Sequence, residues 1–183
     1  MRIEPSEIPD VKRLWPTRHG DGRGWLAEAW RDDDLAAAGI PARFVQQNWS
    51  SSTARGTVRG LHFQAAPAAQ GKLVFVVRGS VFDVAVDLRP DSATYRRHVT
   101  ATLSAADGGQ LWIPAGFAHG FCTLEPDTDV IYALTHAYSP AHERGIAWDD
   151  PDIAIAWPDV GPVTQSARDR HLPRLRELPE NQS

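Results

Sequence analysis

One histidine of this chain lies inside an apolar segment, which reads RGLHFQ over residues 59–64. Imidazole has an ordinary pKa of about 6.5, so His62 could remove a proton near neutral pH if a carboxylate oriented its ring. A core histidine bonded to a backbone carbonyl would fit the same spacing. His62 is therefore a candidate general base whose partner the local sequence does not name.

Lysine is rare here, since Lys12 and Lys72 are the only two among 19 basic residues. Lys72 opens an apolar run, residues 72–77, that is typical of a strand, and alternation places it on one face with Val74 and Val76. We expect the ammonium to lie in an enclosed space, although the long stem could also carry it to solvent.

Titratable groups interrupt two further apolar segments. Asp83 and Asp87 alternate with apolar residues within residues 81–88, and Tyr132 and His136 share one predicted face within residues 130–138. Isolated burial of such groups is unfavourable, so a polar cavity inside the fold explains them best. Tyr132 would equally fit a core aromatic with a satisfied hydroxyl.

The segment QLWIPAGFAHGF, residues 110–121, carries a Pro-x-Gly-x-x-His spacing that ends at His119. This spacing resembles the second motif of the cupin superfamily, in which a tight turn delivers a histidine into a jelly-roll barrel. A metal site needs three or four converging ligands, but the first motif here offers His62, Gln64 and then a cationic Lys72. We therefore expect a barrel without a metal or other cofactor.

Turn signals separate short apolar or β-branched runs along most of the chain. Strands are predicted over residues 25–30, 43–49, 57–63, 72–77, 81–88, 98–103, 117–124 and 130–138. Helices are predicted only over residues 32–38 and, briefly, after Ser166. This pattern indicates an all-β fold, a cupin-like jelly-roll barrel or sandwich with a few short helices, as a single domain over residues 1–183 with a loose end at 179–183.

The chain has 183 residues, and 19 basic against 23 acidic residues give a net charge of −4. No basic stripe is present, which argues against a nucleic-acid partner. No apolar run has the ~18 residues that a membrane span requires. A single cysteine, Cys122, and a start without an apolar signal core favour a cytoplasmic protein away from membranes.

Ordered motifs along the chain resemble the dTDP-4-dehydrorhamnose 3,5-epimerase family, a class of cupin-like nucleotide-sugar epimerases. They lie in residues 21–28, 44–48, 58–64, 70–74, 81–89, 111–121 and 143–148. The family epimerises a 4-keto-6-deoxy sugar at C3 and C5 through enolates. The resemblance thus implies conversion of dTDP-4-keto-6-deoxy-D-glucose to dTDP-4-keto-L-rhamnose.

The resemblance also implies roles for individual residues. His62 matches the family base, Asp169 the carboxylate that orients it, Tyr132 the acid, and Lys72 the stabiliser of the enolate. Without the family, Asp169 would pass as a helix cap or a solvated charge.

Substrate-binding positions follow from the same resemblance, because a nucleoside diphosphate needs cations and an aromatic platform. Arg23 and Arg59 match pyrophosphate ligands, and Tyr138 matches the residue that stacks on thymine. The other matched positions are Glu28, Gln47, Asn48, His119, Glu143 and Arg168. A homodimer is also implied, because N-terminal strands of the family cross between subunits.

Some positions depart from the family pattern. Gln47 is more often acidic there, Phe75 replaces a residue that is often basic, and Arg168 stands where lysine is common. These departures leave the preferred sugar and nucleotide open. A C3-only epimerase or a non-catalytic sugar-nucleotide-binding cupin would share most of the motifs. A ketoisomerase would lack the tyrosine at 132, and a dioxygenase would need a metal.

Overall fold

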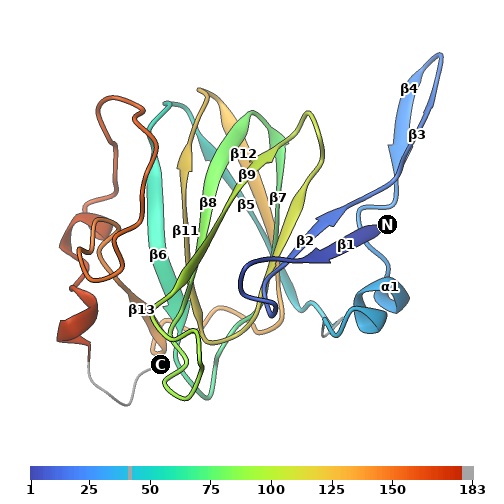
Figure 1. The fold of residues 1–183 in the computed structure, drawn as a ribbon. Helices are drawn as coiled ribbons and strands as arrows, with labels where there is room; N and C mark the ends of the chain where they lie inside the picture. Colours follow the sequence, from blue (N-terminus) through green and yellow to red (C-terminus); the bar gives the residue numbers. More distant parts are fainter. Residues whose placement is uncertain (41–42, 179–183) are drawn as a thin grey trace.

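The computed structural model describes residues 1–40 and 43–178 and places two antiparallel sheets face to face (Figure 1). The six-stranded sheet has the order β1 (Arg2–Pro5), β2 (Lys12–Trp15), β10 (Gln110–Ile113), β7 (Lys72–Arg78), β12 (Thr128–Leu134) and β5 (Gln46–Ser52). The five-stranded sheet has the order β13 (Glu143–Gly145), β6 (Val58–Gln64), β11 (Phe117–Thr123), β8 (Ser80–Asp87) and β9 (His98–Ser104). The expected all-β sandwich is confirmed.

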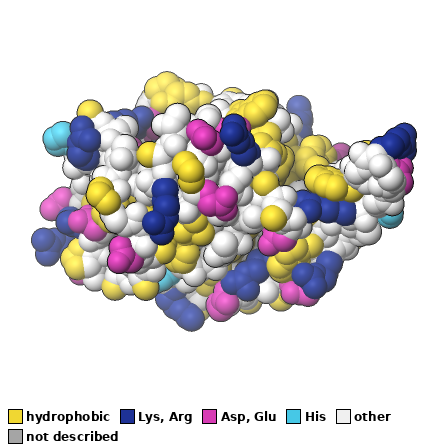
Figure 2. Space-filling view, turned by 90° about the horizontal axis from the view of Figure 1, so that it is seen from above, with side chains coloured by type: hydrophobic (Ala, Val, Ile, Leu, Met, Phe, Trp, Pro, Cys, Tyr) yellow, Lys and Arg dark blue, Asp and Glu magenta, His cyan; other side chains and the backbone are white. Residues whose placement is uncertain are grey.

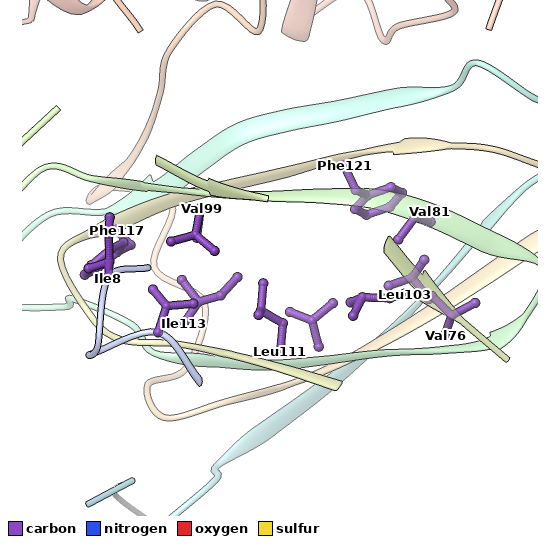
Figure 3. Packing of buried hydrophobic residues seen from close by; sticks show 13 residues of the cluster. Ile8, Val76, Val81, Val99, Leu103, Leu111, Ile113, Phe117 and Phe121 are labelled. Carbon is purple, nitrogen blue, oxygen red and sulfur yellow. The ribbon is translucent and has the colours of Figure 1, made fainter. Parts of the chain in front are cut away.

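Apolar side chains fill the space between the sheets, as Figure 3 shows. Val76 and Leu111 come from the six-stranded sheet, while Val81, Leu103 and Phe121 come from the five-stranded one. Strand alternation makes this core possible, because every second residue points inward. The inward-facing polar residues of the same strands then have to gather in a separate cavity.

The outer faces of the sheets are covered differently. The segment that ends in the 3-10 helices η1 (Asp169–His171) and η2 (Leu175–Glu177) packs on the five-stranded sheet, with Ile153 and Leu175 against Val84 and Val86 (Figure 1). The helix α1 (Asp32–Ala37) covers part of the other sheet. A hairpin of β3 (Arg18–Asp21) and β4 (Gly24–Ala27) projects away from both sheets.

The long predicted strands and the first helix are present within a few residues of their expected ends. The strands that the sequence pattern missed are β1, β2, β3, β10 and β13, which have only three or four residues each. All of them except the buried β10 carry charged side chains. Three or four residues are too few for a period-2 alternation of apolar and polar residues to be recognised in a sequence.

Three predictions about local structure were wrong in detail. The strand predicted over residues 130–138 ends at Leu134, so His136 lies in an exposed turn instead of sharing a face with Tyr132. The strand predicted over 25–30 is the shorter β4. The helix expected after Ser166 is reduced to η1. The predicted loose end at 179–183 lies outside the described residues.

No helix within residues 1–40 and 43–178 combines the length and the apolar character needed to cross a bilayer.

Candidate active site

A cavity of about 500 Å³ opens between the two sheets. His62 on β6 and His119 on β11 line it from the five-stranded sheet, and Lys72 on β7 and Tyr132 on β12 line it from the other. A smaller cavity of about 130 Å³ shares His62, Lys72 and Tyr132 with it. The polar cavity expected from the sequence therefore exists, and three of the predicted catalytic side chains line both the larger and the smaller cavity. Asp87 was expected there as well, but its buried carboxylate accepts from Arg89, Ser92 and Thr94 instead.

The imidazole of His62 is held by Asp169 in η1. Nε2 of His62 lies 2.8 Å from Oδ1 of Asp169, and the second carboxylate oxygen accepts the N–H of Gly60 at 3.2 Å. Burial opposes ionisation of Asp169, but its bonds to His62, Gly60 and Ser166 outweigh this and lower its pKa. The side chain of His62 is 30% exposed and lines both cavities, so it is fixed at one nitrogen and open to the cavity.

Lys72 is buried, as its place on an apolar strand predicted. Its Nζ donates to the backbone carbonyl of His62 at 3.1 Å. Burial lowers the pKa of Lys72 to about 8, although the charges of Asp83 and Glu143 act in the opposite direction. The ammonium thus lies beside the candidate base, and its charge is weakly solvated. A negative charge that develops nearby would stabilise the charged form of Lys72.

His119 is bonded to a carboxylate that the sequence analysis did not assign to the site. Its Nε2 lies 2.9 Å from Asp83, which is fully buried on β8. Burial lowers the pKa of His119, with Asp83 opposing and the nearby charges of Lys72 and His62 adding to the effect. Asp83 therefore supports both His119 and Lys72. Its position among apolar neighbours on a buried strand was the only signal for it in the sequence.

Two glycines let the strands that carry the histidines approach closely. His62 and His119 are directly paired across β6 and β11. Gly60 has a φ of 118°, and a Cβ there would lie 2.6 Å from Cα of Gly120. A Cβ at Gly120 would lie 2.8 Å from the carbonyl oxygen of Arg59. Side chains at these two positions would push the strands apart, so the glycines set the spacing of the histidines.

Tyr138 and Glu143 line the smaller cavity, and Arg168, which lines the larger one, joins them as one rim cluster. The Tyr138 hydroxyl donates to Glu143, and Nη1 of Arg168 lies 2.7 Å from the same carboxylate oxygen. Burial opposes ionisation of Glu143, but these two bonds lower its pKa overall. The bond to Glu143 raises the pKa of Tyr138. Asn48 on β5 lines this cavity as well.

Three glutamine amides hold the backbone of residues 136–139, the segment that carries Tyr138. Oε1 of Gln46 accepts the N–H of Tyr138 at 2.7 Å, and Oε1 of Gln64 accepts the next N–H at 2.7 Å. Nε2 of Gln70 donates to the first carbonyl of the segment at 2.5 Å. No local pattern in the sequence predicts these three hydrogen bonds, because each of them joins residues far apart in the chain.

The predicted binding residues do not all reach the cavity of this chain. Arg59 lines it, with its guanidinium donating to Ser52 and to the Ser51 carbonyl. By contrast, Arg23 lies at the tip of the hairpin with its side chain 91% exposed and paired with Asp21.

Glu28 and Gln47 also lie away from the cavity. Glu28 is paired with Arg31. Gln47 is exposed on the outer face of β5, because its neighbour Asn48 faces inward and strand alternation turns it away. The expected contact of these two residues with substrate stays a prediction.

No three His, Cys, Asp or Glu side chains in the part of the chain that the structure describes gather as a metal-binding group. His62 and His119, the histidines of the two motifs, are each bonded to an aspartate. The interpretation of the site as metal-free stays a prediction.

A family model described as dTDP-4-dehydrorhamnose 3,5-epimerase matches residues 5–177. A protein named dTDP-4-dehydrorhamnose 3,5-epimerase from Sinorhizobium fredii is 48% identical over 179 residues, covering 98% of this chain and 92% of the relative.

Two solved structures have the same fold. The dTDP-4-dehydrorhamnose 3,5-epimerase of Bacillus anthracis, with TDP and pyrophosphate bound, has a TM-score of 0.91 and 44% identity, covering 95% of this chain and 99% of that one. The dTDP-6-deoxy-D-glucose-3,5-epimerase of Legionella pneumophila, in complex with dTDP-4-keto-L-rhamnose, has a TM-score of 0.92 and 40% identity, covering 97% and 94%. Together with the paired histidines and the buried lysine, these matches show that the chain belongs to the dTDP-4-dehydrorhamnose 3,5-epimerase family.

Proposed function

We propose that this chain is an isomerase that epimerises dTDP-4-keto-6-deoxy-D-glucose at C3 and C5 to give dTDP-4-keto-L-rhamnose. The observation that carries the proposal is the cavity in which the His62–Asp169 pair, Lys72 and Tyr132 converge from two sheets. Membership of the family, and the ligand of the Legionella relative, support this substrate class.

We assign the base to Nδ1 of His62. A neutral imidazole has one N–H and one lone pair, and the carboxylate of Asp169 accepts the N–H of Nε2. Nδ1 is then left with the lone pair. It removes the proton from C3 or C5, each of which is α to the C4 ketone, and the C–H electron pair moves into an enolate.

Lys72 stabilises the enolate oxygen. Negative charge appears on the C4 oxygen only as the proton leaves, so a buried ammonium aimed at it lowers the barrier more than it favours the ground state. The partial desolvation of Lys72 strengthens this interaction.

Tyr132 returns a proton from the opposite face of the ring, which inverts the carbon. The two residues come from facing sheets, with Tyr132 on β12 and His62 on β6. A sugar between them presents opposite faces to the base and the acid. The tyrosinate and the imidazolium then exchange protons with water before the second carbon reacts.

The nucleotide occupies the rim. Arg59 and Arg168 bind the diphosphate, Tyr138 stacks on the thymine, and Glu143 and Asn48 contact the nucleotide end. Tyr138 is 50% exposed, which leaves its ring open for stacking. His119 faces the sugar.

A second copy of the chain completes the site. Trp25 and Leu26 on the projecting hairpin are 61% and 75% exposed, and Trp49 and Val77 on the outer face of the six-stranded sheet are 70% and 44% exposed. Figure 2 shows the hairpin as a protrusion from the body. Burying these apolar groups in a homodimer would also carry Arg23 and Glu28 of one copy toward the other.

The remaining predictions are a cytoplasmic location, a single domain and a reaction without a cofactor. The one cysteine, Cys122, is buried and free, which is compatible with a reducing compartment.

The experiment that tests the proposal follows dTDP-4-keto-6-deoxyglucose by NMR in deuterated water. Deuterium at both C3 and C5, with a product that a downstream reductase converts to dTDP-L-rhamnose, is the expected result. Deuterium at C3 alone would identify a 3-epimerase, and none at either carbon in a protein that binds dTDP would identify a binding module.

A further inference from the structure

Gln165 lines the large cavity, and the nitrogen of its side-chain amide is a donor that has no partner. Its Nε2 is buried and makes no hydrogen bond within residues 1–40 and 43–178. Buried amide groups are nearly always hydrogen-bonded, because an unpaired donor loses its water without compensation. Neither the catalytic pair nor the rim cluster uses this amide.

The backbone on either side of Gln165 is fixed. The residue before it, Thr164, exchanges two hydrogen bonds of 2.9 Å with the chain at the start of β6, through the N–H of Val58 and the carbonyl of Gly56. The residue after it, Ser166, accepts the N–H of Asp169 at 3.0 Å. The free amide therefore belongs to an anchored segment, the same one that carries the carboxylate of the catalytic pair.

The surroundings of Gln165 fit an acceptor-rich ligand. Arg59 and Arg168 line the same cavity, and both are cations that donate only. A sugar diphosphate in the cavity would offer many oxygen acceptors and a negative charge to these donors. A neutral amide adds a donor there without adding to the charge near Lys72.

We propose that the side-chain amide of Gln165 turns toward the cavity when the substrate binds, so that Nε2 donates a hydrogen bond to an oxygen of the sugar diphosphate portion of the substrate. This makes Gln165 a further substrate-binding residue. The identity of the ligand rests on the proposed function. The contact would favour ligands with an acceptor at this point and disfavour those with a donor or an apolar group.

The test measures binding of dTDP and of dTDP-glucose, which lacks the 4-ketone and does not react, by calorimetry. Gln165→Met keeps the length of the side chain and removes the donor, so it should weaken binding roughly two- to tenfold, as loss of one neutral hydrogen bond does. Gln165→Glu offers only acceptors and a negative charge, so it should weaken binding more than the methionine variant. In turnover, Gln165→Met should raise KM by a similar factor and change kcat little.

The two ligands distinguish the possible acceptors. A loss of affinity for both dTDP and dTDP-glucose would place the contact on the diphosphate. A loss for dTDP-glucose alone would place it on the hexose. Wild-type affinity of Gln165→Met for both ligands would overturn the proposal.

Val163→Ala serves as the matched control, since Val163 lies on the same segment and does not line the cavity. It should bind both ligands as the wild type does, and melting temperatures should show that all variants are folded. If the variants bind as expected but the wild type exchanges no α-proton, the Gln165 contact holds and the proposed reaction fails. If the wild type epimerises and Gln165→Met binds normally, only the Gln165 contact fails.

Discussion

Nε2 of His62 and Oδ1 of Asp169 lie 2.8 Å apart although 107 residues separate them in the chain. The carboxylate is almost completely buried, and it also accepts the N–H of Gly60, two residues before the histidine. This geometry fixes the ring and its tautomer together.

Asp169→Asn should reduce kcat by about 10²-fold or more, because an amide neither holds the same tautomer nor stabilises the imidazolium. Affinity for dTDP should change little, since the nucleotide lies at the rim. Steady-state kinetics and calorimetry on the same preparation check both statements. Activity within about threefold of the wild type would contradict the orienting role of Asp169.

Tyr132→Phe should separate proton exchange from inversion. His62 can still remove a proton and return it to the same face, so deuterium should enter the substrate while product formation slows by about 10²-fold or more. NMR in deuterated water measures both in one sample, with His62→Ala as the variant that loses both. If Tyr132→Phe loses exchange and inversion equally, the tyrosine is not the acid.

Because of Lys72, the activity of the protein should fall and its stability should rise as the pH increases above about 8. Since burial lowers its pKa to about 8, kcat/KM should fall as the pH rises above about 8 and the ammonium is lost. In the unfolded chain the lysine stays protonated to a higher pH. The unfolded state therefore binds more protons above pH 8, and the free energy of unfolding rises with pH there.

Lys72→Met provides the reference for this prediction. It cannot titrate, so the stability of the wild type relative to the variant should increase between pH 8 and 10 in urea unfolding. Its kcat should fall by about 10²- to 10³-fold, as removal of an oxyanion-stabilising donor does. If the residual kcat/KM of Lys72→Met still falls as the pH rises above about 8, the fall is due to the titration of another group.

Asp83→Asn should move the alkaline limb of the wild-type profile to lower pH. The carboxylate of Asp83 raises the pKa of Lys72, and asparagine removes the charge while keeping the size of the side chain. The pH profile of kcat/KM measures the shift. An unchanged limb would mean that Asp83 supports His119 alone.

Gln46→Met should raise KM by roughly two- to tenfold and leave kcat nearly unchanged, because it frees the N–H of Tyr138 and loosens the stacking residue. Gln46→Glu keeps an acceptor for that N–H and should restore much of the affinity. A methionine variant with the KM of the wild type would show that Gln64 and Gln70 hold the segment without it.

The sequence predicted the long strands and the burial of Lys72, because residues 72–77 form an apolar run in which this lysine is the one charged residue. It pointed to His62 and His119 through local motifs, and to Asp169 only through the family resemblance. The sequence marked Asp83 only as a polar group in an apolar strand, and its bond to His119 on another strand was not predicted. The three glutamines were not predicted either, because a hydrogen bond to a distant backbone atom leaves no local pattern. Gln47 and Arg23 show the converse, because their motifs match while the fold of one chain turns them away.

The close approach of Gly60 and Gly120 limits how this enzyme can be redesigned. Neither position accepts a side chain without separating β6 from β11, so a mutant library that varies this seam would consist largely of inactive proteins. Selectivity for another sugar can be sought on β5, on β12 or in residues 164–168, where side chains also border the cavities. The positions of His62 and His119 then stay constant while the other side chains that line the cavities are varied.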